Sequence, residues 1–183
     1  MEAAAAEPAS AGPRVRLVQL PLPALRALGD GDLDTANAVG PVRLTAYFIQ
    51  PDQRSTWARR AAQVSADPGA ADWVTGVIVA LDLGGVPVGR AGFHAPPDKS
   101  GMVEIGYSID PEHRRRGYAR AAFEALLERA RREPSVRVVR VSIAPDNDAS
   151  MAVVAPYGFA KVGEEWDEED GLEYVYERSA TTG

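Results

Sequence analysis

The sequence predicts an α/β protein with a mixed β-sheet that begins as an antiparallel meander and continues with central parallel strands. Residues 74–109 contain three runs rich in aliphatic residues and separated by turn residues, which is typical of consecutive antiparallel strands. Residues 117–132 carry the clearest helical pattern, and another strand-like run follows at 136–143. Parallel strands joined by a helix need a right-handed crossover, so the pairing changes from antiparallel to parallel after residues 102–109.

The length of 183 residues suits a single domain, which we place at residues 14–179. Residues 1–13 are rich in Ala, Glu and Pro and offer little to bury, so we expect a disordered tail there. With 45% hydrophobic and 25% charged residues, the composition is that of a soluble globular protein. No apolar stretch reaches the roughly 18 residues of a membrane span, and no signal peptide is recognisable. We therefore expect a cytoplasmic protein without a membrane partner.

Composition also excludes several classes of function. The chain has no cysteine, so it has no disulfide framework, cysteine nucleophile or thiolate metal site. The two histidines, His94 and His113, are far apart in the sequence, and no metal is expected. The formal net charge of -6 argues against a dedicated nucleic-acid partner, because such proteins usually carry a basic excess.

The first elements follow from local patterns. Residues 15–18 predict a strand that Pro21 ends. Residues 22–39 have apolar residues at helical spacing but are interrupted by two Gly-Asp pairs, so they predict two short helices. Residues 51–64 predict a longer helix that starts at a proline and buries one side.

The later elements complete the mixed sheet. Residues 74–83 and 86–94 predict a hairpin, because Gly84-Gly85 between them has the permissive backbone of a tight turn. After the third strand and the long helix, which Pro134 ends, the sequence predicts a buried strand at 136–143, a short helix at 147–155 and closing strands at 159–164 and 172–178.

A short arginine-rich loop connects the strand at 102–109 to the long helix. Arg114, Arg115 and Arg116 precede Gly117, near which the helix begins. The unpaired amides and the positive dipole end of a helix start attract anions, and a glycine lets a phosphate approach the backbone. The loop predicts an anion site suited to a pyrophosphate, with a solvated arginine run as the alternative. It is neither a Walker loop nor a dinucleotide fingerprint.

This segment resembles the pyrophosphate-binding motif of the GNAT superfamily of acetyl-CoA-dependent N-acetyltransferases. The motif Gln/Arg-x-x-Gly-x-Gly/Ala corresponds to Arg114-x-x-Gly117-x-Ala119. Around it stand Glu104-Ile105-Gly106-Tyr107-x-Ile109-x-Pro111, Asn147-Asp148-Ala149-Ser150 and Tyr157-Gly158-Phe159. The similarity extends over nearly the whole chain from Arg14, and the branch it resembles most is that of ribosomal-protein N-terminal acetyltransferases of the RimJ/RimL type.

The resemblance implies the GNAT fold with a site for acetyl-CoA. Strand 102–109 would splay from strand 136–143, and pantetheine would enter the gap and pair with exposed backbone like an added strand. The backbone amides of residues 115–120 would hold the pyrophosphate. The implied cofactor-binding residues are Tyr107, Ser108, Ile109, Arg114, Arg115, Arg116, Gly117, Tyr118, Ala119, Arg120 and Asn147. Asn147 would also cap the helix that it precedes, and capping alone is the alternative.

Acetyl transfer to an amine requires a neutral amine, a donor for the developing oxyanion and departure of the thiolate. Glu104 is the candidate base, since strand alternation places it on one face with Gly106 and Ser108. A surface or ion-paired glutamate is the alternative. A backbone N–H near Ser108 and Ile109 would serve as the oxyanion donor.

The candidate general acid departs from the family pattern. Many relatives carry a tyrosine seven residues after the motif asparagine, where this chain has Val154. Tyr157 is expected to pack rather than react, which leaves Ser150 and Tyr107 as substitutes. Because a thiol with a pKa of about 8.5 departs as thiolate with modest help, the departure does not exclude an enzyme.

Two further features are expected near the acceptor. His94, at the end of a strand, could take the amine proton or be a hydrogen-bonded structural histidine. An acidic run around Trp166 could attract a cationic amine or be a solvated loop. It consists of Glu164, Glu165, Asp167, Glu168, Glu169 and Asp170.

These observations predict an enzyme that transfers acetyl from acetyl-CoA to a primary amine by direct attack. The acceptor would be a protein N-terminus, a lysine or a small molecule. One alternative is a catalytically silent acyl-CoA-binding module, suggested by Val154. Another is a protein that faces nucleic acid through Arg114-Arg115-Arg116 and Arg59-Arg60. Homodimers through the C-terminal strands are common in the family, so a homodimer is a partner to test.

Overall fold

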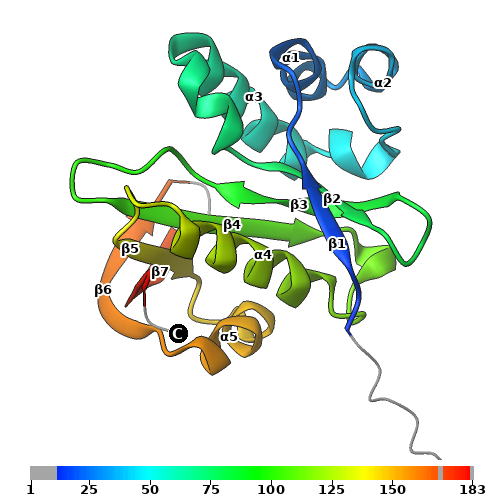
Figure 1. Cartoon of the computed structure of the whole chain (residues 1–183). Helices are drawn as coiled ribbons and strands as arrows, with labels where there is room; N and C mark the ends of the chain where they lie inside the picture. Colours follow the sequence, from blue (N-terminus) through cyan, green and yellow to red (C-terminus); the bar gives the residue numbers. More distant parts are fainter. Residues whose placement is uncertain (1–11, 169–170, 182–183) are drawn as a thin grey trace, which may run out of the picture.

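The computed structural model describes residues 12–168 and 171–181, and a seven-stranded mixed sheet forms the centre of this part of the chain (Figure 1). Its strand order is β1-β2-β3-β4-β5-β7-β6. The strands are β1 (Val15–Val18), β2 (Gly76–Ala80), β3 (Val86–Phe93), β4 (Met102–Ile109), β5 (Val138–Ile143), β6 (Ala160–Asp167) and β7 (Gly171–Ser179). All neighbours are antiparallel except β4 and β5, which are parallel, so the predicted mixed sheet is confirmed.

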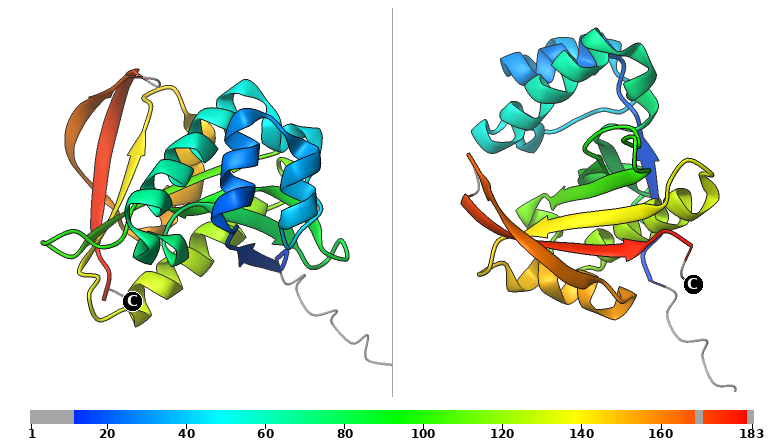
Figure 2. Two further views of the ribbon diagram at one scale, coloured as in Figure 1. Left: turned by 90° about the horizontal axis from the view of Figure 1, so that it is seen from above. Right: turned by 90° about the vertical axis from the view of Figure 1, so that its left-hand side faces the viewer.

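Helices cover both faces of the sheet. The α-helices are α1 (Leu22–Asp30), α2 (Leu33–Val39), α3 (Pro51–Ala66), α4 (Tyr118–Arg132) and α5 (Asp148–Val154). Short 3₁₀ turns are η1 (Ala46–Ile49), η2 (Pro68–Asp72), η3 (Pro111–His113) and η4 (Ala155–Tyr157). The first three α-helices lie over one face, and α4 and α5 lie over the other (Figure 2). Among the described helices, none combines the length and apolar character of a membrane span.

The core is divided between these two layers. One cluster of buried residues packs α4 onto the sheet, with Phe123 and Leu126 at its centre, and the other packs α1 and α3 around Phe48 and Trp57. Strand β2 serves both clusters, because Ile78 faces the first and its neighbours face the second. This two-sided burial explains its continuous apolar sequence.

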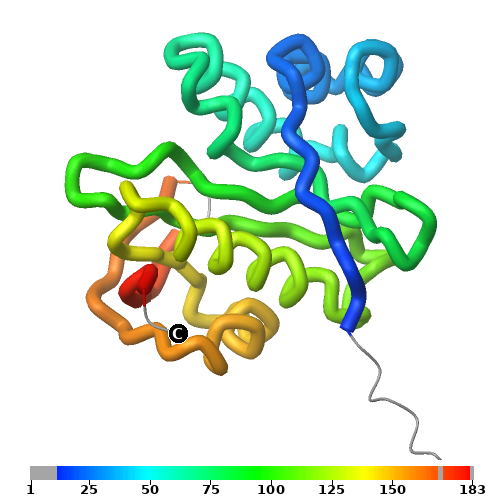
Figure 3. Tube along the Cα trace, viewed as in Figure 1, coloured from blue at the N-terminus to red at the C-terminus, as the bar shows by residue number. Residues whose placement is uncertain are grey.

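One strand differs from its sequence prediction, and the order of the last two strands was not predicted. The sequence predicts a strand over residues 74–83, but β2 is shorter and ends at Ala80. The chain turns there, and the amide of Gly85 donates to the Ala80 carbonyl at 2.9 Å. Gly84 and Gly85 have φ angles of 71° and 96°, as their place in a tight turn requires. The last strand, β7 (red in Figure 3), lies between β5 and β6, an order that local patterns do not reveal.

Candidate active site

A gap opens between β4 and β5 at the centre of the sheet. The two strands pair only between residues 102–104 and 138–140. Beyond Glu104, β4 continues to Ile109 beside β3, whereas β5 pairs with β7 over its whole length. Each strand keeps one hydrogen-bonded neighbour, so both remain ordered where they separate. The predicted splay is confirmed.

Alternation along β4 decides which backbone groups face the gap. The carbonyl of Glu104 accepts a hydrogen bond from the amide of His94 at 2.8 Å, so the backbone groups of even-numbered residues point toward β3. The odd-numbered residues Tyr107 and Ile109 therefore direct their N–H groups toward the gap. The amide of Ser108 faces β3, which removes it as a donor in the gap.

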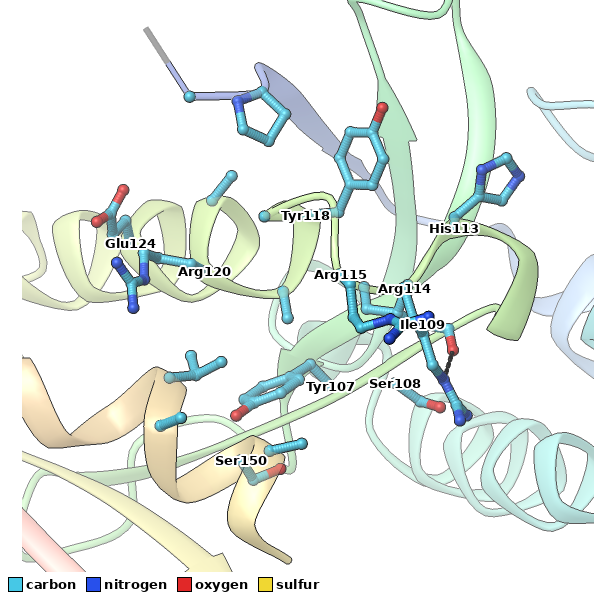
Figure 4. A pocket seen from close by; sticks show the side chains of 18 of the residues that line it. Tyr107, Ser108, Ile109, His113, Arg114, Arg115, Tyr118, Arg120, Glu124 and Ser150 are labelled. Carbon is cyan, nitrogen blue, oxygen red and sulfur yellow. Dashed lines mark hydrogen bonds between the residues drawn. The ribbon is translucent and has the colours of Figure 1, made fainter. Parts of the chain in front are cut away.

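The turn before α4 has an unusual backbone. Arg115 and Gly117 both adopt left-handed conformations, with φ angles of 59° and 84°, and this is uncommon for a residue other than glycine. Nε of Arg114 donates to the carbonyl of Ile109 at 3.1 Å, which fastens the turn to the end of β4 (Figure 4). No side chain caps α4 at Gly117, so its first amides remain available.

A first cavity, of about 950 Å³, adjoins this turn and the gap (Figure 4). Most of the residues implied in cofactor binding line it, namely Tyr107, Ser108, Ile109, Arg114, Arg115, Gly117, Tyr118, Ala119, Arg120 and Asn147. Arg116 is exposed and is not among the lining residues. Gly12 and Pro13 also line it, and sequence reasoning missed them because residues 1–13 read as a tail. Residues 1–11 of that tail lie outside the described residues.

A second cavity, of about 720 Å³, lies on the α3 side of the sheet. Glu104 and His94 line it, together with residues of α3, β5 and the last two strands. The residues that line both cavities are Tyr107, Ser108, Asn147 and Ser150. The two cavities therefore adjoin at the gap, where a molecule in one can reach a molecule in the other.

Glu104 places a largely buried carboxyl on the wall of the second cavity. Its side chain is 18% exposed, and Oε1 lies 3.7 Å from Nδ1 of His94. Burial raises the pKa of Glu104, and the carboxylate of Glu165 raises it further, whereas the Ser142 hydroxyl and the charges of Arg140 and Arg60 act in the opposite direction. A carboxyl with a raised pKa is better suited to accept a proton near neutral pH.

His94 is neutral at physiological pH. Burial lowers its pKa to about 4, and the charges of Arg60, Arg59 and Arg90 act in the same direction. Although 44% of the side chain is accessible, the ring lines the second cavity, where three arginine charges oppose its protonation. The ring lies over Gly106, where any Cβ would collide with Nε2.

Tyr107 and Ser150 approach each other at the junction of the cavities (Figure 4). Burial raises the pKa of Tyr107, whereas the Ser150 hydroxyl lowers it. The geometry nevertheless completes no hydrogen bond, and the Tyr107 hydroxyl is buried without a partner among the described residues. The side chain of Asn147 accepts a hydrogen bond from the Ser150 amide at 3.0 Å, so the predicted cap of α5 is confirmed.

Val154 and Tyr157 were not expected to supply the acid, and their surroundings agree with this. Val154 is 2% exposed and contributes an apolar patch to the second cavity. The Tyr157 hydroxyl donates to Glu124 at 2.5 Å, and its ring packs against Phe123 with centroids 5.3 Å apart. Tyr157 therefore packs, as expected, and leaves Tyr107 and Ser150 nearest the gap.

Charged residues of α3 and β3 were missing from the predicted acceptor side. Arg59, Arg60 and Arg90 line the second cavity. Arg60 is only 4% exposed, which excludes it from the nucleic-acid surface considered for the Arg59-Arg60 pair. The sequence could have indicated that Arg60 is buried, because it stands three residues after Trp57 and so shares the apolar face of α3.

Only part of the acidic run around Trp166 lines the second cavity. Glu165 and Asp167 line the second cavity, whereas Glu164 pairs with Lys161 at 2.8 Å. Glu169 and Asp170 lie outside the described residues. Within residues 12–168 and 171–181, no three His, Asp or Glu side chains are grouped as metal ligands.

Comparisons with known proteins relate this chain to acetyltransferases. The Acetyltransferase (GNAT) domain model matches residues 24–160. Two uncharacterized N-acetyltransferases of Bacillus subtilis (strain 168), YjdG and YoaA, are 35% and 33% identical over 72 and 76 residues. These matches cover 39% and 42% of this chain and 43% of each relative, so they span less than half of the relatives' length.

Solved structures share the fold at low sequence identity. A GNAT-family acetyltransferase from Bacillus anthracis superposes with a TM-score of 0.59 and 18% identity, covering 92% of this chain and 96% of that chain. The ribosomal L7/L12 acetyltransferase RimL in complex with coenzyme A gives 0.61 and 18%, with 92% and 95% covered. Dodecameric spermidine N-acetyltransferase from Vibrio cholerae gives 0.61 and 13%, with 92% and 95% covered.

The family match runs from α1 to the first residue of β6 and includes the splayed strands, the arginine turn and α4. It covers more than half of the chain, and the solved structures reproduce the same arrangement of sheet and helices. This chain therefore belongs to the acetyltransferase (GNAT) domain family.

Proposed function

We propose that this protein transfers the acetyl group of acetyl-CoA to a primary amine by direct attack. The observation that carries the proposal is the gap between β4 and β5, which joins two cavities of different chemistry. One lies at the uncapped start of α4 beside arginines, and the other contains the buried carboxyl of Glu104. A transfer between two substrates needs such an arrangement, because alignment of the reacting groups removes much of the barrier.

The residues of the first cavity fit acetyl-CoA as a substrate. Free amides at the start of α4, with Arg114 and Arg115 beside them, suit a pyrophosphate. The N–H groups of Tyr107 and Ile109 suit an extended arm that carries its own amides, added like a strand at the gap. Coenzyme A is bound in the RimL structure, a protein of the same fold.

Each step of the transfer has a candidate group in this chain. Acetyl-CoA supplies an acyl group activated as a thioester. The N–H of Tyr107 or Ile109 would donate to the carbonyl oxygen as negative charge develops on it. Glu104 would accept the proton of the amine, directly or through water, and neutral His94 is the alternative acceptor.

The leaving sulfur would receive help from hydroxyl groups at the junction of the cavities. Tyr107 and Ser150 are the candidates, since both line the two cavities and approach each other there. The help required is modest, because a thiol departs as a thiolate near neutral pH.

The acceptor is an amine on a protein N-terminus, a lysine or a small molecule. The motifs favour the RimJ/RimL branch and hence a protein N-terminus. The structural relatives include enzymes named for the ribosomal L7/L12 protein and for spermidine, so all three kinds of amine belong in the test.

A catalytically silent acyl-CoA-binding module is the second candidate. Buried, apolar Val154 stands where many relatives carry a tyrosine, and this observation favours it. Tight binding of coenzyme A without turnover of any amine would support this candidate.

Calorimetry with coenzyme A tests the binding half of the proposal. Reversing both charges in Arg115→Glu/Arg116→Glu should weaken binding by about tenfold or more, because the anion meets like charge. The matched control is Arg131→Glu/Arg132→Glu, which makes the same charge change at the other end of α4. No heat with the wild-type chain, or equal affinity in both double variants, would refute the site.

The transfer half is tested by thiol release from acetyl-CoA with a panel of amines. The panel contains peptides with free N-termini, N-blocked lysine peptides, spermidine and small amines. Stimulation of thiol release by one class, with the acetylated amine identified by mass spectrometry, supports the transferase. Binding of coenzyme A without any stimulation contradicts it.

A further inference from the structure

The second cavity has a lining of mixed charge that is divided by element. Its carboxylates are Asp52, Glu104, Glu165, Asp167 and Glu173, and its guanidinium groups are Arg59, Arg60 and Arg90. The arginines all come from α3 and β3, whereas every carboxylate except Asp52 comes from β4, β6 or β7. A purely cationic acceptor would meet attraction at one wall and repulsion at the other.

Arg60 is the most informative of these groups because it is buried and its hydrogen-bond partners are neutral. Nε donates to Thr75 Oγ1 at 3.1 Å, and Nη1 donates to Gln63 Oε1 at 2.8 Å and to the carbonyl of His94 at 3.0 Å. None of these partners is a carboxylate. Glu104 compensates part of this charge electrostatically, but no carboxylate is hydrogen-bonded to Arg60 among the described residues, so the buried guanidinium is costly unless a further anion binds beside it.

Arg60 is positively charged at neutral pH, and its charge acts on other groups that line the second cavity. Burial lowers the pKa of Arg60 to about 10, so it stays protonated at neutral pH. The same guanidinium is the first of the three charges that depress the pKa of His94, which lies beside Glu104. Arg90 is held by Gln53, whose side chain also donates to Asp52, so its charge is partly compensated within the protein.

We infer that the acceptor amine of this enzyme also carries an anionic oxygen group, a carboxylate or a phosphonate, which binds beside Arg60. The amine would face Glu104, and the anionic group would face the α3 wall. The acceptor is thus a zwitterion rather than a polyamine or a simple alkylamine. This inference rests on the proposed transferase activity, because it names the substrate class of the same site.

A spacing series of small amines tests the inference with the wild-type chain. The probes are ω-amino carboxylates from glycine to 6-aminohexanoate, each compared with its neutral ω-amino amide, together with aminoalkylphosphonates and spermidine. At the best spacing the carboxylate or phosphonate should exceed its neutral partner in kcat/KM by about tenfold or more, because the amide leaves the buried charge unpaired. Whichever of the two series, carboxylates or phosphonates, has the higher kcat/KM identifies the anionic group.

Variants of Arg60 assign the preference to this residue. Arg60→Gln should bring the ratio of carboxylate to amide close to one, mainly through a higher KM for the carboxylates. Arg60→Lys retains the charge and should restore part of the ratio. Arg54→Gln is the control, because Arg54 lies on the same helix and donates to the carbonyls of Gly29 and Asp30. If Arg60→Gln fails to fold, the wild-type ratio still decides.

The outcomes separate the two proposals. Turnover of neutral amines or spermidine at least as fast as every anionic amine overturns the inference and leaves the transferase standing. Binding of coenzyme A without turnover of any amine overturns the transferase and the inference together. A preference for anionic amines that survives in Arg60→Gln removes Arg60 from the inference.

Discussion

Glu104 and His94 lie side by side, yet they do not form an ion pair at neutral pH. Burial disfavours the charged form of each group, so the pKa of Glu104 rises and that of His94 falls to about 4. The 3.7 Å between Oε1 and Nδ1 is too long for a hydrogen bond. The two shifts favour Glu104 over His94 as the acceptor of a proton from an incoming amine, because a raised pKa increases proton affinity and a lowered pKa reduces it.

Replacing Glu104 tests its role as the base. Glu104→Gln keeps the shape of the side chain but removes its proton affinity, so kcat should fall by about 10²-fold or more. The dissociation constant of coenzyme A should not change. In the wild type, kcat should fall as the pH drops through the raised pKa of Glu104, and this limb of the profile should be absent in the variant.

Glu133→Gln, at the distant end of α4, is the matched control and should behave as the wild type. If Glu104→Gln retained the wild-type rate and pH profile, the proton acceptor would have to be another group, with His94 the next candidate.

His94 should make stability depend on pH in a defined direction. Its pKa is about 4 in the folded chain and 6.5 ordinarily, so the unfolded chain binds the proton first as the pH falls. Stability therefore decreases between pH 6.5 and 4, and His94→Asn removes this contribution. Urea unfolding of both proteins at pH 7.5, 5.5 and 4.5 measures it. A difference in unfolding free energy that is constant over this range would contradict the lowered pKa.

At the scale of elements, the turn before α4 combines rigidity with free backbone amides. Two left-handed residues, Arg115 and Gly117, bring the chain into the helix, and Arg114 fastens the turn to β4. A bound anion would therefore meet the arginines on a fixed backbone, an arrangement suited to the selection of a phosphate at a helix start.

Gly117→Ala should damage this turn. An alanine at a φ of 84° costs about 1–2 kcal/mol, and its Cβ would lie 3.1 Å from Pro13. We expect a corresponding loss in the free energy of unfolding and weaker binding of coenzyme A. Gly163→Ala is the control, because a Cβ at Gly163 meets nothing within 4 Å. Equal stabilities of the two variants would show that the turn tolerates a side chain.

At the scale of the whole molecule, the sheet ends in an exposed edge. β6 is the outer strand, and its Val162 and Trp166 are 57% and 77% exposed. Unpaired edges and exposed apolar side chains favour pairing with another chain. The edge therefore supports a homodimer through the C-terminal strands, as the family resemblance suggests.

Trp166→Ser should weaken such a dimer. Light scattering over a range of concentrations should give a dimer for the wild type and a shift to monomer for the variant. Leu83→Ser is the control, since Leu83 is also exposed but lies in the turn between β2 and β3. A monomer at every concentration of the wild type would rule out the dimer.

The arginine turn and the cap at Asn147 were predictable from the sequence, because their chemistry depends on residues that are neighbours along the chain. Even Arg60 left a local signal on the buried stripe of α3. Its place in the second cavity was missed because the apolar residues around it read as a helix face, and the cavity includes residues of distant strands.

The sequence by itself determined the order of helices and strands, the mixed pairing of the sheet and the arginine turn before α4. Periodicity, turn residues and charge within short windows are sufficient to specify them. Only the tertiary structure decided that β7 inserts beside β5, that two cavities adjoin at Tyr107 and Ser108, and that a buried arginine lines the second cavity. These features depend on contacts between segments far apart in the chain, and the residue pattern of a single segment does not reveal which distant segment it will contact.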